Sequence, residues 1–187
     1  LRRLEAEAIR DAMLAVSDCL DPTLYGEPVP VHLTEFMKGR GRPRVSGPID
    51  GEGRRSIYTS IRRNFLPPMM LVFDMPTPFS TFGMRNTSNV PAQSLTLLND
   101  PFVIEQAHYW AMEVLKTAAT PEQRIEQIFL RALSRRPDAA EVREAMNFLH
   151  TQARAYACEE PEALDDLQEW QDYCHAVFNF KEFIHLI

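Results

Sequence analysis

The sequence predicts a mainly α fold, α+β with a minor β element. About five helices form the C-terminal half, and a long Pro/Gly-rich loop and a short strand precede them. Three observations predict this. Apolar residues recur at helical spacing at both ends of the chain. Residues 21–55 contain five prolines and six glycines, too many for a long helix or a central strand. Residues 56–62 alternate apolar and polar side chains, as a strand does.

The first elements follow in order along the chain. Residues 1–20 form an entry helix, which Asp21-Pro22 ends because the residue before proline avoids the α region. Residues 21–55 form an irregular loop with many basic side chains. Residues 56–88 hold the predicted strand, RSIYTSIRR, and then a proline-rich segment that begins with the apolar run MMLVFD.

Residues 89–187 form the helical part. A capping residue followed by proline marks several helix starts, because the missing N–H of proline costs nothing in a first turn. Starts are expected at Asn89 with Pro91 in the first turn, at Asp100-Pro101, at Thr120-Pro121, near Asp138 and near Pro161, and ends at about Ala118, Leu133 and Leu186 for the second, third and fifth helices.

The length of 187 residues predicts a single domain over residues 1–187. We expect this domain to be a fragment of a larger protein, because the sequence starts at Leu1 directly inside a helical pattern and without methionine. No apolar stretch approaches the roughly eighteen residues that a membrane span requires, so no span is expected.

Positive charge is concentrated in residues 38–64, which hold eight Lys and Arg and two acids, whereas the rest of the chain holds 12 and 24. The segment contains RGRPR, which looks like the Arg-Gly-Arg-Pro core of AT-hooks that enter the DNA minor groove. Such hooks belong to disordered basic tails, and this chain has a formal net charge of −6. We therefore expect no nucleic-acid partner.

Three interpretations of the arginines remain open. An anion site is one, because guanidinium binds carboxylate, sulfate or phosphate in a bidentate manner. Its candidate residues are Arg54, Arg55, Arg62, Arg63, Arg40, Arg42, Arg44 and Arg85. Ion pairing within the domain is the second, with Asp50, Asp74 and Glu52 as acid partners, and the 24 acids elsewhere favour it. Docking against an absent upstream domain is the third.

Cysteine and nucleophile chemistry is not indicated. Cys19, Cys158 and Cys174 form no C-x-x-C pair, so they are expected to be small core residues, with a Cys158–Cys174 disulfide as the alternative in an extracytoplasmic protein. The sequence has no G-x-S-x-G nucleophile motif. Neighbours on a helix point about 100° apart, so Cys174 and His175 cannot form a catalytic dyad by themselves.

No metal site is expected. Two E-x-x-H pairs, Glu105 with His108 and Glu182 with His185, have the spacing found in di-iron helical bundles. With five histidines and the usual frequency of glutamate, roughly 0.4 such pairs arise by chance, so two are only mildly unusual and assign no ligand.

Four motifs fall in an order that resembles a known family. They are RRSIY, FDMPTP, NVPAQSLTLLNDPF and NFKEFI. Together they resemble domain of unknown function 1553, the planctomycete-specific domain, over nearly the whole chain. GMRN departs from the family pattern, because Met84 stands where an arginine is expected beside Arg85.

The resemblance implies context rather than chemistry. It implies the C-terminal part of a large secreted planctomycete protein, usually after a planctomycete cytochrome c domain and a second uncharacterised domain. Location would then be periplasmic or extracellular, haem would belong only to an upstream domain, and this fragment would hold no cofactor. The upstream domains of the same polypeptide are the implied partners.

We expect the function of an accessory or scaffold domain, with an anionic, carbohydrate-like polysaccharide as candidate ligand. The alternative is part of an enzyme acting on polysaccharide, whose site is shared with the missing upstream domain. No motif identifies a catalytic residue.

Overall fold

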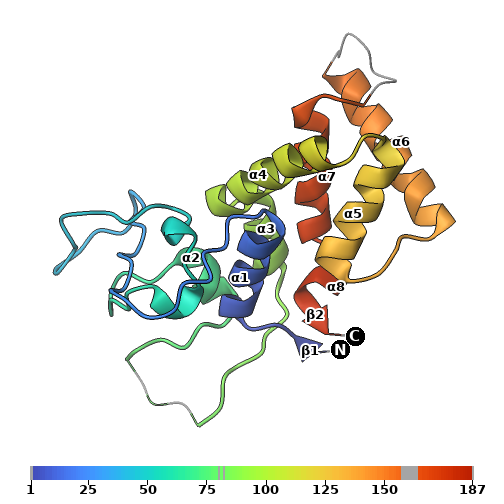
Figure 1. The fold of residues 1–187 in the computed structure, drawn as a ribbon. Helices are drawn as coiled ribbons and strands as arrows, with labels where there is room; N and C mark the ends of the chain where they lie inside the picture. The colour runs from blue at the N-terminus through green and yellow to red at the C-terminus, as the bar shows by residue number, and fades with distance from the viewer. Residues whose placement is uncertain (1, 80, 82, 157–163, 187) are drawn as a thin grey trace.

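A computed structural model describes residues 2–79, 81, 83–156 and 164–186. Its described part contains eight α-helices and one two-stranded sheet, which confirms a mainly α fold with a minor β element. The later helices gather on one side of the molecule, and the irregular segments between α1 and α3 extend on the other (Figure 1). No described helix is long and apolar enough to cross a membrane.

The first four helices of the C-terminal half begin close to the predicted positions. Their bounds are α3 (Pro91–Asn99), α4 (Pro101–Thr117), α5 (Pro121–Leu133), α6 (Ala139–Ala155), α7 (Leu167–Phe178) and α8 (Lys181–Ile184). The side chains of Asp100 and Thr120 accept hydrogen bonds from the first turns of α4 and α5, as predicted, and Asp138, near which a helix start was predicted, caps α6 in the same way. The prediction of Asn89 as a cap is wrong, since α3 starts after Val90.

The long last helix predicted from Pro161 to Leu186 is also wrong. Its predicted start lies outside the described residues, and the chain breaks between α7 and α8 at Phe180, whose backbone is extended. This break turns the chain so that the ring of Phe183 packs against that of Phe178 at 5.1 Å. Packing between these two aromatic rings therefore favours the break at Phe180 over one continuous helix.

The chain ends pair with each other. Helix α1 (Ala6–Val16) is shorter than the predicted helix 1–20, because β1 (Arg2–Arg3) is an antiparallel partner of β2 (His185–Leu186). The backbone N–H of Leu4 continues this pairing by donating to the carbonyl of Ile184 at 2.8 Å. Both ends of the chain consequently lie side by side (Figure 1).

The strand predicted at 56–62 is wrong. The segment begins as a 3-10 helix, η2 (Ser56–Tyr58), and makes only isolated bridges, which join Val29 to Thr59 and Arg62 to Phe65. Ser56 causes the turn, because its backbone N–H and its hydroxyl both donate to the carboxylate of Asp11 in α1. This anchor competes with an extended ladder for the same backbone N–H. Nearby lie η1 (Gly51–Gly53) and α2 (Pro68–Val72).

Buried apolar side chains of α1 to α8 form one continuous cluster. Its largest members include Trp110 in α4 and Phe178 in α7, whose rings lie 5.2 Å apart. A separate small cluster under the irregular loop consists of Val31, Leu33 and Phe65. Helix α1 contributes three large, fully buried side chains to the main cluster and also contacts η2, so it joins the helices to the loop segments.

Candidate functional site

The eight candidate arginines separate into two groups. Arg54, Arg55 and Arg85 form ion pairs with acids of α1 or of the segment before and after it. The other five lie on the surface. Arg40, Arg42 and Arg44 belong to the irregular loop of residues 21–55, and Arg62 and Arg63 follow η2. The structure therefore does not bring the eight guanidinium groups to one place.

Arg54 is held by the protein itself. Its guanidinium stacks on the ring of Tyr58 at 4.3 Å, donates to the carbonyl of Tyr25 at 2.6 Å and lies 3.7 Å from the carboxylate of Asp21. The hydroxyl of Tyr58 in turn accepts from the backbone N–H of Tyr25 at 2.8 Å. These contacts fasten the start of the irregular loop to η2.

An arginine outside the predicted set organises the centre of this region. Arg10, on α1, is 7% exposed and donates to the carbonyls of Arg54 and Asp50 and to the hydroxyl of Ser56. Burial lowers the pKa of Arg10, and the nearby carboxylate of Asp11 opposes this effect. The sequence carried a signal, because Arg10 lies four residues after Ala6 and three before Met13, on the apolar face of the entry helix.

The predicted acid partners have different neighbours from those expected. Asp50 uses its carboxylate to accept from the backbone N–H of exposed Glu52 at 3.0 Å, and it offers only its carbonyl to Arg10. Gly51 makes this approach possible: its φ is +63°, and a Cβ there would lie 2.6 Å from Nη2 of Arg10. Arg55 lies 3.8 Å from Asp11 rather than from Asp50.

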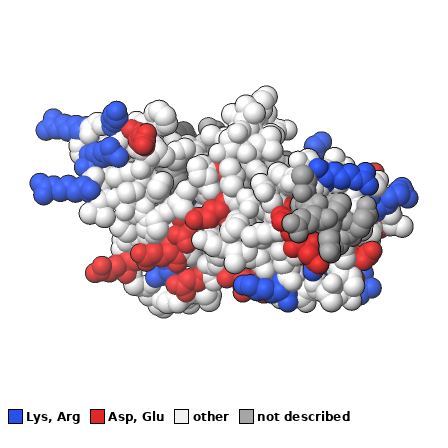
Figure 2. Space-filling view, turned by 90° about the horizontal axis from the view of Figure 1, so that it is seen from above, with Lys and Arg blue, Asp and Glu red and all other residues white. Residues whose placement is uncertain are grey.

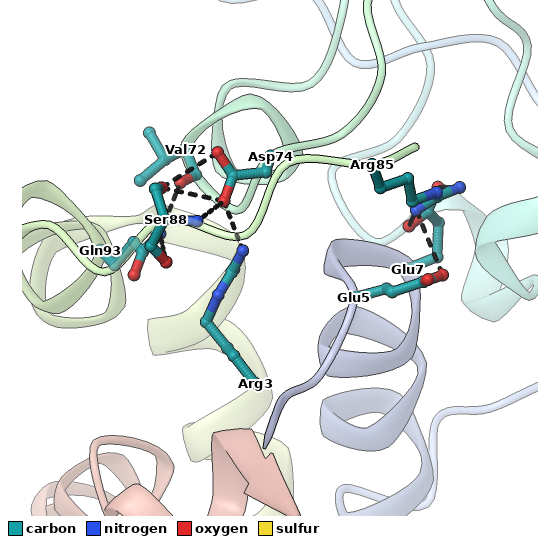
Figure 3. A network of polar contacts seen from close by, with 8 residues as sticks. All are labelled: Arg3, Glu5, Glu7, Val72, Asp74, Arg85, Ser88 and Gln93. Carbon is teal, nitrogen blue, oxygen red and sulfur yellow. Dashed lines mark hydrogen bonds and ion pairs between the residues drawn. The ribbon is translucent and has the colours of Figure 1, made fainter. Parts of the chain in front are cut away.

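Asp74 pairs with Arg3 and not with an arginine of residues 38–64 (Figure 3). The side chain of Arg3 is only 5% exposed, and the central carbon of its guanidinium lies 5.3 Å from the ring centre of Phe73. The carboxylate of Asp74 also accepts from the backbone N–H and the hydroxyl of Ser88, and Gln93 donates to the carbonyls of Val72 and Ser88. This network joins β1, the end of α2 and the entry to α3.

Arg85 forms a second, more exposed group beside this network (Figure 3). Its two terminal nitrogens donate to the two carboxylate oxygens of Glu7 at 2.7 and 3.0 Å, and Glu5 lies 3.2 Å away. Burial raises the pKa of Glu7, but the hydrogen bonds and charge of Arg85, together with a backbone hydrogen bond, outweigh it and hold that pKa below its usual range. The neighbouring Met84 is 85% exposed.

The five remaining candidate arginines have no acid partner in the part of the chain that the structure describes. Arg40, Arg44, Arg62 and Arg63 are exposed and make no ion pair within the described residues. Arg42 makes one long hydrogen bond, 3.4 Å, to the carbonyl of Thr34. Figure 2 shows Lys and Arg side chains projecting from the end of the molecule at which the irregular loop lies in Figure 1.

Three of the four E-x-x-H residues make ordinary polar contacts, whereas one carboxylate oxygen of Glu105 is buried without a hydrogen-bond partner among the described residues. His108 shares a hydrogen bond with the Gln171 side chain at 2.9 Å, and Glu182 pairs with Arg135 at 2.7 Å. Across the described part of the chain, no three His, Cys, Asp or Glu side chains lie close enough together to hold a metal ion.

The cysteines that the structure describes are free thiols. Cys174 is fully buried in α7, which raises its pKa, and Cys19 is partly buried. His175 bonds to the carbonyl of Leu97 at 2.7 Å, away from a thiol. Cys158, the partner in the alternative disulfide, lies outside the described residues.

Comparison with known proteins gives a family and no function. No curated protein and no solved structure matches the sequence. The family model PSD1, described as a protein of unknown function (DUF1553), matches residues 1–149, which is most of the 187-residue chain. The chain therefore belongs to the PSD1 family, DUF1553.

Proposed function

We propose that this chain is an accessory domain that attaches its protein to an anionic polysaccharide through the arginines its own acids leave unpaired. One observation carries the proposal: Arg40, Arg44, Arg62 and Arg63 have no acid partner in the described structure, although the chain has an excess of acids. Arginines needed for folding are paired, so the unpaired ones are available to a ligand.

The surroundings of these arginines favour a polysaccharide over a bare ion. Phe36 is 93% exposed and Val45 is 71% exposed, and both lie in the same loop as Arg40 and Arg44. An exposed aromatic ring can pack against the apolar face of a sugar ring, while guanidinium groups bind its sulfates or carboxylates. Acidic or sulfated glycans combine both features in one ligand.

The family resemblance supports the setting of this proposal. The domain would work in the periplasm or outside the cell, as part of a secreted multidomain protein whose upstream domain carries haem. In that setting it would hold the upstream domains at an anionic matrix. This domain would need no cofactor of its own.

The test is a binding titration against heparin, which is sulfated, and polygalacturonate, which carries carboxylates. We expect Arg40→Gln/Arg42→Gln/Arg44→Gln to bind about tenfold more weakly than the unmodified chain, equivalent to roughly 1.4 kcal/mol from exposed charge pairs. Binding should also weaken as salt rises, because exposed charges are screened over about 10 Å at 0.1 M salt.

The matched control removes three exposed charges elsewhere, as Lys116→Gln/Arg143→Gln/Lys181→Gln. It changes the net charge equally and should bind like the unmodified chain. If both variants lost the same amount of glycan affinity, the effect would be one of net charge alone, and the loop would be rejected as the binding site. Preference for an A·T-rich DNA duplex over both glycans would reject the polysaccharide.

A further inference from the structure

A partly enclosed cavity of about 110 Å³ lies where the irregular loop crosses α2 and the start of α4. Three chain segments far apart in the sequence build it, and Arg10 of α1 closes one side. Its apolar wall consists of Pro30, Pro48, Ile49, Pro67, Pro68, Met69, Met70, Pro101 and Phe102. Five of these are prolines, which have one fixed backbone dihedral, so the wall is rigid before any ligand arrives.

A few polar side chains face this apolar wall. His32, Thr34, Thr59 and Asp100 all line the cavity. Asp100 uses one carboxylate oxygen to cap α4, through the backbone N–H of Phe102 at 2.9 Å, and its other oxygen has no hydrogen-bond partner within the described structure. A small number of convergent polar groups in an apolar pocket is the usual composition of a ligand site.

The imidazole of His32 has a fixed position. Its Nδ1 lies 3.0 Å from the carbonyl of Gly47, and Nε2 makes no hydrogen bond with the described residues. Gly47 is required at this crossing, because a Cβ on it would lie 1.8 Å from the carbonyl oxygen of Pro30. When Nδ1–H donates to Gly47, Nε2 is left as a second hydrogen-bond acceptor beside Asp100.

Charge selects the class of ligand. The free groups are mainly acceptors, so the ligand must donate hydrogen bonds, as an alcohol or an ammonium ion does. The positive guanidinium of Arg10 lines the same cavity, and the start of α4 adds a partial positive charge, so Asp100 does not leave a net negative site. Burial raises the pKa of Asp100, consistent with weak stabilisation of its charge. A neutral donor fits better than a cation.

We propose that this cavity binds a neutral ligand with an apolar ring face and a hydroxylated edge, as in a cyclic polyol or a sugar ring. An apolar cavity of roughly 150 Å³ admits the six carbons of benzene, so about four non-hydrogen atoms of the ligand can be enclosed in this cavity of about 110 Å³, and the rest of the ligand lies in its opening. The ligand is either a free small polyol or the neutral end of a polysaccharide. This site is separate from the unpaired arginines and does not depend on them.

The test uses ligand-observed NMR with 1,2-cyclopentanediol and two analogues of similar size, cyclopentylammonium and cyclopentanecarboxylate. We expect the diol to bind best and the carboxylate least. Asp100→Asn, which can still cap α4, should weaken diol binding about fivefold, the difference between a hydrogen bond to a charged acceptor and one to a neutral group. Thr59→Phe fills the cavity and should abolish binding.

The matched control is Asp166→Asn, which alters the single cap of α7 in the same way. It should leave diol binding unchanged, and circular dichroism should show the same helix content in every variant. A neutral dextran oligosaccharide that binds as well as the diol identifies a chain end, whereas binding of the diol alone identifies a free polyol. Absence of diol binding, preference for the carboxylate, or equal effects of Asp100→Asn and Asp166→Asn would overturn the proposal.

Discussion

Arginine has two roles in this protein, and burial separates them. Arg3 and Arg10 are almost fully buried, and each joins segments distant in the sequence. Arg40 and Arg62 are exposed and free of acid partners in the described structure. A buried guanidinium that lost its partners would be strongly destabilising, whereas an exposed one contributes little to folding.

The pair of Arg3 and Asp74 gives a prediction about stability. Arg3→Met leaves the partly buried carboxylate of Asp74 with Ser88 as its remaining partner, so we expect the free energy of unfolding in urea to fall by about 2 kcal/mol. Arg2→Met, at the exposed neighbouring position, should change it by less than about 0.5 kcal/mol. Similar effects of the two substitutions would show that the Arg3–Asp74 pair does not stabilise the fold.

Glu169 gives a prediction about pH. This residue of α7 is 1% exposed, and its carboxylate accepts no hydrogen bond from a side chain among the described residues. Burial raises the pKa of Glu169 to about 7. The folded chain therefore keeps a proton near neutral pH that the unfolded chain has lost, so stability falls as pH rises. Between pH 5 and 8 the unmodified chain should lose about 2 kcal/mol more than Glu169→Gln in urea unfolding. Parallel pH profiles would exclude a raised pKa.

At the scale of elements, local signals in the sequence determined helix starts better than helix ends. Asp100, Thr120 and Asp138 cap helices because their side-chain oxygens lie close in sequence to the first backbone N–H groups and accept hydrogen bonds from them. The end of α7 depends instead on packing of Phe183 against Phe178, which the spacing of apolar residues does not encode. The strand expected at 56–62 failed for the same reason, because Asp11 from a distant helix binds Ser56.

In the candidate site, too, local features could be predicted from the sequence and tertiary contacts could not. Sequence composition indicated where positive charge is concentrated, and the exposed arginines do lie there. It could not indicate that Arg54 stacks on Tyr58 or that Asp74 pairs with Arg3, because those partners are brought together by tertiary structure. The cavity at His32 could not be predicted from the sequence either, since its walls come from three separate segments.

Arg135 joins three helical elements and gives a prediction at this scale. It follows α5 and binds Glu141 of α6 and Glu182 of α8, with nitrogen to oxygen distances of 2.7 to 2.8 Å. Hydrogen bonds from Arg135 lower the pKa of Glu141 to about 2, so this contribution to stability is lost as pH falls from about 4.5 toward 2. Arg135→Met should lower the free energy of unfolding at pH 7 by about 1 kcal/mol, because the groups are partly exposed.

The same variant should lose less stability than the unmodified chain between pH 5 and 3. Arg136→Met is the control: Arg136 is 78% exposed and pairs only with Glu126 among the described side chains. Its acid profile should match that of the unmodified chain. A steeper acid loss in Arg135→Met would contradict the assigned ion pairs.

At the scale of the whole molecule, one helix connects two differently built halves. Helix α1 buries Ile9, Met13 and Leu14 completely among the later helices and holds the irregular loop through Arg10. Complete burial of one such side chain contributes about 1.5–3 kcal/mol, so these three account for an amount comparable to the whole stability of a typical domain, about 5–15 kcal/mol. The helical part therefore depends on a segment far from it in the sequence.

This dependence predicts the behaviour of a shortened chain. Without residues 1–20, the remaining residues 21–187 should keep much of their helical circular dichroism but lose near-ultraviolet signal and cooperative thermal unfolding, because the core is left open along α4 and α5. The control replaces residues 38–45, an exposed loop end, with a Gly/Ser linker of equal length and should unfold cooperatively. A synthetic peptide of residues 1–20 should restore cooperative unfolding to the shortened chain. If residues 21–187 unfold cooperatively alone, α1 is an appendage, and the helical part is a domain in its own right.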